Sequence, residues 1–596
     1  MKEKNSIKDI FENNIYALRL IFKNCPFMVI YKLLYSVMNG LLATIDVYFL
    51  SYTIKLIESG AGFSKVILYV LLLMGIIIAY NCATLAVNAK IMPYYSYKTN
   101  SVIRAAVYKQ AAHVDLKFYE DPKYYNDLNL AVTEGISRIE QVLDSLSYLL
   151  SSLATLFSIS VLTYMINPVV MLFYCIPIIV MLLDKKRMDA GFALNKKINA
   201  ISRRNDYFNR CFTQKEYAEE LRTTGISLPL IKHFRENMEQ AKKVYKTDGM
   251  RVAVVSFCQS VVTECAMSIL IYVYVAYQTL VKRTMQFGDC IVLVKAVSNV
   301  DFAVQGVLEN IMVFREHSMY IGKLRDFLND ESTIENSDAG VSAENGDIEF
   351  RNVSFRYSGS SDNNISRVSF RINKGEKVAI VGQNGAGKTT LIKLLLRLYD
   401  PDSGEILVNG SNIRDYALKS YRGLFGVMFQ DFKHFSMSIS ENVLFRSVDA
   451  ADKEIVRASI TKSGLENRVN KLPKAEDSIL GREFDSEGAV LSGGEAQKLA
   501  LARIIASNRD ILVLDEPSSA LDPIAEDEMY STLYSSFAGR TMIFISHRMS
   551  STVNADKILF VENGAICEMG SHSELMHKNG KYAEMFRIQA DSYKKD

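Results

Sequence analysis

The sequence lacks paired cysteines, a strong charge of one sign and a cleavable signal. Its eight cysteines are scattered and no C-x-x-C pair occurs, which argues against a disulfide framework or a zinc site. The formal net charge is only +3, and this near balance predicts no nucleic-acid partner. The N-terminus is charged and carries no secretory signal. We also find no internal repeat and no low-complexity segment, so the 596 residues are expected to form more than one ordinary domain.

Long apolar runs fill the first half of the chain. Six of them approach the ~20 residues that a helix needs to cross a bilayer, and they lie at about 27–54, 66–89, 144–166, 169–183, 252–281 and 288–314. The fourth is short. Helices buried in a large soluble protein are the alternative, but the run that starts at Leu68, L-Y-V-L-L-L-M-G-I-I-I-A-Y, is apolar on every face. We predict a six-helix transmembrane domain over residues 1–325, which begins with an amphipathic helix on the cytoplasmic membrane surface.

The distribution of Lys and Arg predicts the orientation in the membrane. Segments 90–140 and 184–250 are rich in both, whereas the short connections between the other spans hold almost none. Positive charge is retained on the cytosolic side. We therefore expect the long connections, both termini and the second half of the chain to be cytosolic. Helical periodicity in the long connections predicts that the spanning helices continue into the cytosol.

Ionisable residues inside apolar spans are costly and are candidates for function. Those found here are Asp46, Glu264, Lys295 and Asp301. In the last span, Ser298, Asp301, Gln305 and Glu309 follow one another at spacings that place them in one stripe along a helix. We expect these residues to line a substrate path, with hydrogen bonding between helices as the alternative.

A glycine-rich loop, V-G-Q-N-G-A-G-K-T-T, occupies residues 381–390 in the second half of the chain. It follows a short apolar run and precedes an amphipathic one, which is the context of a phosphate-binding loop. Its glycines allow the tight turn that points N–H groups at phosphate oxygens, and the helix start adds positive charge. Lys388 is placed to reach the β- and γ-phosphates, and Thr389 to ligate Mg²⁺. The predicted ATP-binding residues of this loop are Gly382, Gln383, Asn384, Gly385, Ala386, Gly387, Lys388, Thr389 and Thr390.

Two later apolar runs end in residues suited to hydrolysis. In I-L-V-L-D-E-P, Asp515 is expected in the Mg²⁺ shell, and Glu516 is expected to polarise the water that attacks the γ-phosphate. In T-M-I-F-I-S-H, His547 is placed to contact the γ-phosphate.

Between the phosphate-binding loop and these two runs, L-S-G-G-E predicts the start of another helix. Ser492 is expected as its N-cap, and Glu495 would complete a capping box. Gly493 and Gly494 leave the N–H groups at this helix start open to an anion. One domain would therefore carry two helix starts suited to phosphate.

Together these motifs, in this order, resemble the nucleotide-binding domain of an ABC transporter: G-Q-N-G-A-G-K-T-T, F-Q-D-F, L-S-G-G-E, L-V-L-D-E-P, S-S-A-L-D and His547. With six spans before them, the chain resembles an ABC exporter half-transporter. The resemblance implies an α-helical transmembrane domain followed by an α/β ATPase domain, with a linker at 326–345 and the ATPase domain at 346–596. It also implies a dimer in which ATP lies between one chain's phosphate loop and the other chain's Ser492, Gly493 and Gly494.

The same resemblance assigns further roles. Tyr357 would stack on adenine, Gln430 would sense Mg²⁺ and the attacking water, and Asp522 would link the two sites. Short helices near 116–128 and 223–235 would dock on the nucleotide-binding domains. Glu495 departs from the family, which usually has Gln in this position; as a capping-box residue it would point back to Ser492.

Sequence details favour a sub-family. F-Q-D-F and L-G-R-E-F-D-S-E-G-A-V look more like exporters of lantibiotics and other ribosomal peptides than like drug exporters. We expect no peptidase domain before the first span. We predict a dimeric ATP-driven exporter that uses ATP and Mg²⁺ and carries a cationic peptide. The alternatives are a multidrug or lipid exporter, or an ATP-gated or regulatory membrane ATPase that does not pump. The partner would be a second copy of the chain or a homologous half.

Overall fold

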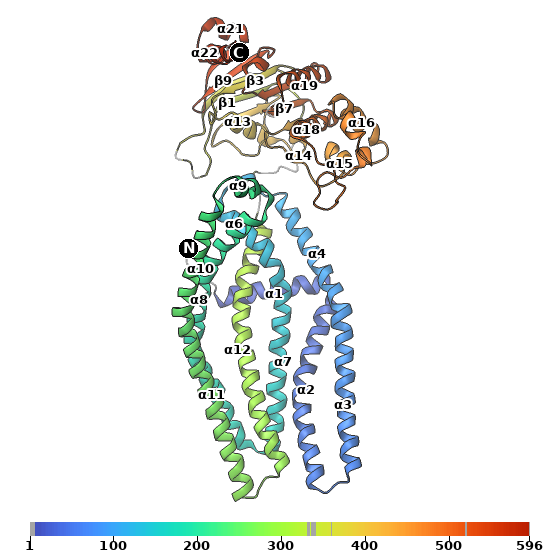
Figure 1. The fold of residues 1–596 in the computed structure, drawn as a ribbon, viewed down its shortest axis with the longest axis vertical. Coiled ribbons are helices and arrows are strands. Elements are labelled where there is room, and N and C mark those ends of the chain that lie inside the picture. Colours follow the sequence, from blue (N-terminus) through green and yellow to red (C-terminus); the bar gives the residue numbers. More distant parts are fainter. Residues whose placement is uncertain are drawn as a thin grey trace. The chain divides into compact units, whose positions relative to one another are not determined.

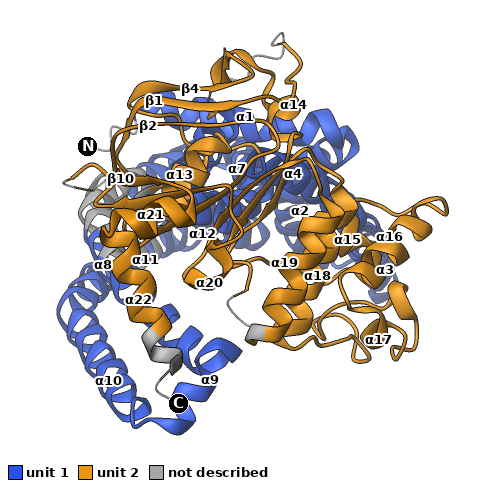
Figure 2. Ribbon diagram, turned by 90° about the horizontal axis from the view of Figure 1, so that it is seen from above, with its two compact units in different colours: residues 1–112, 126–329 blue, residues 113–125, 330–596 orange. Residues whose placement is uncertain are grey.

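The computed structural model describes residues 6–330, 334, 341–358, 360, 362–518 and 521–594. The chain divides into two compact units, which Figure 2 colours separately. Unit 1 comprises residues 1–112 and 126–329, and unit 2 comprises residues 113–125 and 330–596. The sequence predicted one break, at 326–345. The structure shows a second feature: residues 113–125 belong to unit 2, although the sequence on both sides of them belongs to unit 1.

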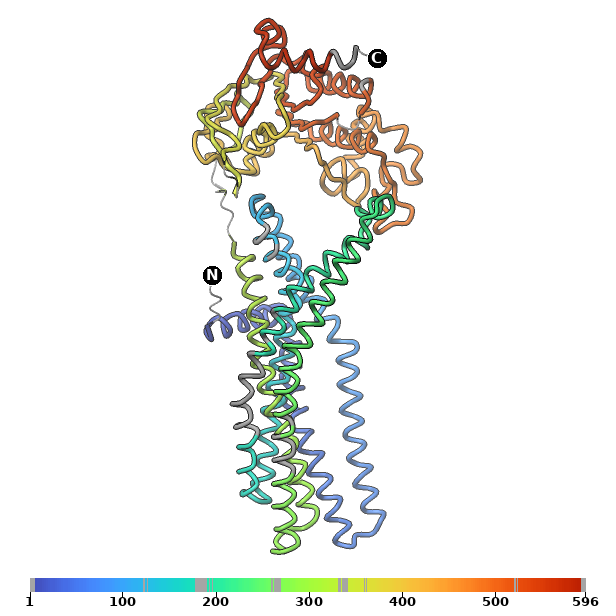
Figure 3. The backbone as a smooth tube through the Cα atoms, turned by 60° about the vertical axis from the view of Figure 1, so that its left-hand side comes forward, coloured from blue at the N-terminus to red at the C-terminus, as the bar shows by residue number. Residues whose placement is uncertain are grey.

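Unit 1 is made of long helices that run side by side, with α1 lying across them (Figures 1 and 3). The helices are α1 (Ile7–Asn24), α2 (Pro26–Glu58), α3 (Phe63–Ala86), α4 (Met92–Ala111), α6 (Pro122–Leu130), α7 (Ile136–Ile166), α8 (Cys175–Thr213), α9 (Ala218–Thr223), α10 (Ser227–Val244), α11 (Met250–Ala276) and α12 (Phe287–Asn329). Single π-helical turns join α3 to α4, α6 to α7 and α10 to α11. The resulting rods are much longer than the ~20 residues that cross a bilayer, as the sequence predicted.

Among the described residues, four rods are long and apolar enough to cross a membrane: Pro26–Glu58, Phe63–Ala111, Asp127–Ile166 and Phe287–Asn329. They contain the first, second, third and sixth predicted spans. The fourth predicted span runs from a 3₁₀ turn, Pro168–Tyr174, into α8, and the fifth lies on α11. Both include side chains outside the described part of the chain, at 177–183 and 262–268, so these two spans remain predictions.

Helix α1 buries polar residues and exposes large apolar ones. The Asn13 amide Nδ2 donates to the carbonyl and hydroxyl oxygens of Ser318 in α12, both at 3.1 Å. In contrast, Ile7 and Phe11 are 87% and 67% exposed. An exposed apolar face is typical of a helix that lies in a membrane surface, which fits the predicted position of this segment.

Unit 2 contains two sheets. A four-stranded antiparallel sheet has the order β2-β1-β4-β5, and a six-stranded sheet has the order β10-β9-β3-β8-β7-β6. Strands β9, β3, β8, β7 and β6 of the larger sheet are parallel, and β10 pairs antiparallel with β9. The strands are β1 (Ile348–Phe355), β2 (Ile365–Ile372), β3 (Lys377–Gly382), β4 (Ser403–Val408), β5 (Ser411–Asn412), β6 (Phe425–Met428), β7 (Ile511–Asp515), β8 (Thr541–Ile545), β9 (Lys557–Glu562) and β10 (Ala565–Gly570).

Helices cover the larger sheet, and their apolar residues pack with β3, β7 and β8 into buried clusters. Strands β7 and β8 are buried at every position, as is typical of parallel strands covered on both faces. The helices of this part of the chain are α13 (Lys388–Leu395), α14 (Leu418–Arg422), α15 (Ile439–Leu444), α16 (Asp452–Lys462), α17 (Glu466–Val469), α18 (Gly493–Ser507), α19 (Pro523–Ser536), α20 (Met549–Thr552), α21 (His572–Lys578) and α22 (Lys581–Lys594). Of these, α15, α16 and α17 pack with α18 in a separate apolar cluster. The predicted fold class, helical domain first and α/β domain second, is confirmed.

Residues 113–125 pack within unit 2 through α5 (Leu116–Glu120). Leu116 lies against the apolar cluster beneath the sheets, and Glu120 pairs with Lys393 of α13 at 3.2 Å. The Tyr124 hydroxyl donates to Asp330 at 3.1 Å. The predicted docking of a short helix near 116–128 is therefore supported for residues 116–125, whereas residues 126–128 belong to unit 1. The corresponding prediction for 223–235 falls on α9 and α10 of unit 1 and stays a prediction.

Helices α2 and α7 pack closely at Gly40, where a side chain would collide with the α7 backbone. A Cβ on Gly40 would lie 2.5 Å from the Ser151 carbonyl oxygen, whereas a Cβ on Gly75 of α3 would meet nothing within 4 Å. Small residues at such crossings let backbones pack closely. We expect Gly40→Val to force the helices apart, at a cost of about 1–3 kcal/mol typical of overpacking.

The measurement is the temperature at which half of the detergent-purified protein still elutes as a single species. It should fall for Gly40→Val and stay near the parental value for the matched variant Gly75→Val. Equal behaviour of the two variants would contradict the packing described here.

Candidate active site

The loop after β3 folds as a phosphate-binding loop. Gly382, Gly385 and Gly387 have φ of 150°, 78° and 103°, which side chains rarely adopt. A Cβ on Gly382 would lie 2.1 Å from the Val561 carbonyl oxygen, so strand and loop pass too closely for any other residue. Gly387 is the N-cap of α13, and the first N–H groups of that helix face the loop.

Lys388 is almost fully buried, and its Nζ donates to the carbonyl oxygens of Gly382 and Gln383, both at 2.9 Å. Burial lowers the pKa of this ammonium, and the nearby carboxylates of Glu516 and Asp515 raise it. The ammonium thus lies between the loop and two acidic residues. A third N–H remains to be directed at a phosphate.

Asp515 ends β7 and is only 2% exposed. Burial raises the pKa of its carboxyl, while a hydrogen bond with Thr389 and the charges of Lys388 and His547 lower it. Its Oδ1 has no hydrogen-bond partner among the described residues. A buried, unsatisfied carboxylate oxygen beside a threonine hydroxyl fits Mg²⁺, which binds one or two carboxylates and completes its shell with phosphates and water.

Two of the predicted catalytic residues, His547 and Gln430, contact the third, Glu516. His547 Nε2 contacts Glu516 Oε1, and Gln430 Nε2 donates to Glu516 Oε2 at 2.9 Å. Glu516 follows β7 with a positive φ of 50°, and its N–H donates to Ile545 of β8 at 3.1 Å. Both carboxylate oxygens are therefore oriented by neighbours, as a general base requires.

Tyr357, predicted to stack on adenine, is half-buried and belongs to a cluster that the sequence did not reveal. Its hydroxyl lies 3.3 Å from Thr390 Oγ1. The Lys393 ammonium lies 5.3 Å from the Tyr357 ring centre and 5.7 Å from that of Tyr399. Since Lys393 also pairs with Glu120, the predicted base site is linked to α5. No spacing in the sequence indicates this cluster.

The second predicted helix start is confirmed. Ser492 is the N-cap of α18; its Oγ accepts from Glu495 N at 3.3 Å, and its N–H donates to Glu495 Oε2 at 2.8 Å. Arg468 Nε lies 3.4 Å from Glu495 Oε1. The carboxylate that replaces the usual Gln is thus turned back and paired. Ser492 and Gly493 are exposed, and none of their hydrogen bonds within the described chain reaches the phosphate loop.

Asp522 is the N-cap of α19, where its Oδ1 accepts from Ile524 N at 3.0 Å and from Ala525 N at 2.9 Å. Its carboxylate thus accepts hydrogen bonds from the first turn of its own helix. The predicted link to a second site remains a prediction. Ser519 and Ala520 of the same motif lie outside the described residues.

The predicted substrate-path residues divide into two groups. Lys295 Nζ donates to Asp46 Oδ2 at 2.8 Å and joins α12 to α2, so these two charges cancel. Along the stripe on α12, Gln305 Nε2 donates to Asp301 at 3.0 Å. Ser298 and Gln305 are exposed in the single chain. The side chain of Glu264 lies outside the described residues.

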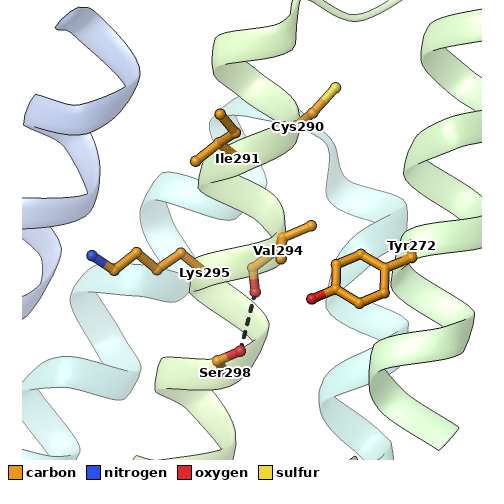
Figure 4. Close-up of a pocket in the computed structure, with 6 residues that line it drawn as sticks. All are labelled: Tyr272, Cys290, Ile291, Val294, Lys295 and Ser298. Atoms are coloured by element: carbon orange, nitrogen blue, oxygen red, sulfur yellow. Dashed lines mark hydrogen bonds between the residues drawn. The ribbon is translucent and has the colours of Figure 1, made fainter. Parts of the chain in front are cut away.

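A pocket of about 450 Å³ lies between α11 and α12 near this stripe (Figure 4). It is lined by Tyr272, Cys290, Ile291, Val294, Lys295 and Ser298. In Figure 4 Tyr272 points from α11 toward Val294 and Ser298, whereas Lys295 extends from the other side of α12. The two predicted path residues Lys295 and Ser298 thus share one pocket.

Comparison with known proteins gives matches over both units. Residues 365–519 match the ABC transporter family. The chain is 29% identical over 510 residues to the subtilin transport ATP-binding protein SpaT of Bacillus subtilis, covering 84% of this chain and 80% of that protein. It is also 40% identical over 247 residues to an ATP-dependent lipid A-core flippase of Paraburkholderia xenovorans. That alignment covers 41% of this chain and 40% of the flippase.

A mitochondrial iron-sulfur clusters transporter ATM1 of Candida glabrata is 40% identical over 248 residues, 41% of this chain and 33% of the relative. Among solved structures, a bacterial Atm1-family ABC exporter with ATP bound superposes with a TM-score of 0.71. It is 21% identical and covers 94% of this chain and 98% of its own. The fold of an exporter therefore extends over nearly the whole chain.

Replacing Glu516 by Gln tests the hydrolytic cluster. The amide keeps the shape of the side chain and can still hydrogen-bond, but it cannot accept the proton of the attacking water. We expect the ATPase rate to fall by about two orders of magnitude, while ATP still binds and protects the protein against thermal unfolding. Glu528→Gln, the same change on the exposed side of α19, should leave the rate unchanged. Near-parental hydrolysis by Glu516→Gln would refute the role assigned to this residue.

Proposed function

We propose that this chain, whose residues 365–519 match the ABC transporter family and whose fold is that of an ABC exporter, forms one half of a dimeric exporter in a cytoplasmic membrane. It hydrolyses ATP, and the hydrolysis is coupled to transport. The observation that carries the proposal is the contact of Glu516 with His547 and Gln430 next to Lys388. We further propose that unit 2 and both termini are cytosolic, since Lys and Arg gather in the long connections.

In this proposal the phosphates of ATP lie in the loop at 382–390 and adenine stacks on Tyr357. Thr389, Asp515 and Gln430 would hold Mg²⁺, which neutralises charge on the phosphates. Glu516 accepts a proton from the water that attacks the γ-phosphate, and His547 contacts that phosphate. The support is geometric, because the structure brings Lys388, Asp515, Glu516 and His547 together from three strand ends.

The dimer is supported by the α18 start. Ser492 and Gly493 are exposed at a helix N-terminus, which suits an anion, and the N–H and hydroxyl of Ser492 bond to Glu495 of the same helix. Two chains arranged head to tail would place each α18 start against the other chain's loop. Every motif is present in this chain, so two identical copies would form two complete sites.

Mixing Lys388→Ala chains with Ser492→Ala chains tests this arrangement. A mixed dimer keeps one composite site with both residues intact, so the mixture should regain about a quarter of the parental rate if half the dimers are mixed. Each variant alone should stay nearly inactive. A mixture no better than either variant, or a purified chain that stays monomeric and inert in lipid, would contradict the homodimer.

For the cargo we propose a cationic, ribosomally made peptide. SpaT is named for subtilin transport, and its alignment extends over both units of this chain, whereas the flippase and iron-sulfur relatives align over 41% of it. Since Asp46 and Lys295 cancel, the negative potential expected along the path depends on Glu264, Asp301 and Glu309. A negative path attracts cationic cargo and disfavours anions.

The test is ATP-driven uptake of peptides, drugs and lipids into sealed inverted vesicles. We expect a basic peptide to accumulate and to stimulate ATP hydrolysis, and Asp301→Asn to weaken that stimulation roughly fivefold, as the loss of about 1 kcal/mol of attraction implies. Asp206→Asn, an equal change on the exposed surface of α8, is the control.

Preference for lipids or anionic compounds, with no effect of Asp301→Asn, would remove the peptide assignment and leave the exporter intact. Stimulated hydrolysis without accumulation of any compound would favour a channel or regulatory ATPase instead.

A further inference from the structure

The last helix of the chain, α22, contacts the loop that carries His547. After β8 the chain passes His547 and Arg548 and enters the short helix α20. The side chain of Gln589 in α22 binds the backbone on both sides of Arg548. Its Nε2 donates to the His547 carbonyl oxygen at 2.7 Å, and its Oε1 accepts from Met549 N at 2.9 Å.

These two backbone groups need such a partner. Met549 is the first residue of α20, and its N–H is one of those that no intrahelical carbonyl can reach. The N-cap residue Arg548 makes no side-chain cap, because a guanidinium has no hydrogen-bond acceptor. It donates instead to Leu521 O at 2.9 Å and pairs with Glu526. Gln589 therefore supplies the cap and binds the preceding carbonyl with one carboxamide. The two bonds also fix which end of the amide is oxygen.

Helix α22 is held firmly where it presents Gln589. Tyr582 is fully buried; its hydroxyl lies 3.0 Å from Thr552 Oγ1, at the end of α20, and 2.7 Å from His572 Nδ1. Met585 and Phe586 pack against the apolar cluster that contains Met549. Residues 582, 585, 586 and 589 lie on one helix face, so the whole of that face is turned to α20 and its surroundings.

We propose that Gln589 is a positioning residue for hydrolysis. By holding the His547 carbonyl and the first N–H of α20, it fixes the backbone from which the His547 imidazole reaches Glu516. A displacement well under 1 Å at such a site weakens a hydrogen bond or an orientation that the reaction needs. The inference rests on the roles proposed above for Glu516 and His547.

The chemistry of the side chain allows three informative substitutions. Gln589→Ala removes both bonds. Gln589→Glu keeps the length and the acceptor for Met549 N, but a carboxylate cannot donate to the His547 carbonyl and is repelled by it. Gln589→Asn keeps the amide but is one methylene too short to bridge both groups. Arg587→Ala changes an exposed residue of the same helix and serves as the matched control.

The experiment measures kcat and KM for ATP with the full-length chain in lipid vesicles, together with the thermal unfolding midpoint of each variant. We expect kcat to fall about three- to tenfold for Gln589→Ala and Gln589→Glu, the range that one or two lost hydrogen bonds give. The KM for ATP should change little, since the side-chain hydrogen bonds of Gln589 in the described part of the chain go to His547 and Met549 and not to the phosphate loop. Arg587→Ala should match the parent.

A second measurement separates positioning from general support of the fold. In a His547→Ala chain, Gln589→Ala should lower the residual kcat by less than about twofold, because the group that it positions is absent. Fully additive losses, or a parental kcat in Gln589→Ala while His547→Ala is inactive, would overturn the inference and leave the proposed function standing. A His547→Ala chain with parental kcat would instead refute the role proposed for His547.

Discussion

The parallel pairing of β3, β8 and β7 sets the position of every group proposed to act on ATP. Neighbouring parallel strands end at the same edge of a sheet, and the residues that follow them meet there. β3 ends in the phosphate loop, β7 in Asp515 and Glu516, and β8 leads to His547. The bond from Glu516 N to Ile545 O extends the pairing beyond the last residue of β7. This bond holds Glu516 in a left-handed conformation that costs a non-glycine residue roughly 1 kcal/mol.

At that edge of the sheet, burial and neighbouring charges shift the pKa values of Lys388 and Asp515 in opposite directions. Burial lowers the pKa of Lys388 and raises that of Asp515, while each of the two charges favours the charged form of the other. Burial is the larger influence on both groups, and the opposite charge nearby offsets part of it. A bound triphosphate would pair with the Lys388 ammonium, and a divalent cation would pair with the Asp515 carboxylate. The buried charges therefore suit the nucleotide-bound site.

Much of unit 2 could be predicted from sequence because its motifs are local. The capping box of Ser492 with Glu495 and the positive-φ glycines of the phosphate loop involve residues at most a few positions apart. The missed features join distant segments: Gln589 with His547, Glu120 with Lys393, and Lys295 with Asp46. Each depends on how elements far apart in sequence are brought together, and composition or spacing carries no signal of that. The polar stripe on α12 is an example. Its spacing in the sequence predicted that its residues share one face of the helix, but it did not predict that the nearby Lys295 pairs with Asp46.

The membership of residues 113–125 in unit 2 has a consequence for the order in which the chain matures. This segment is synthesised between α4 and α7, long before residues 330–596 exist. Until the remainder of unit 2 is made, Leu116 has no apolar cluster to cover and Glu120 has no Lys393 to pair with. A fragment that begins at Asp330 would in turn leave that apolar surface open and Lys393 without its carboxylate. The second unit can therefore complete its core only after all of the first unit has been synthesised.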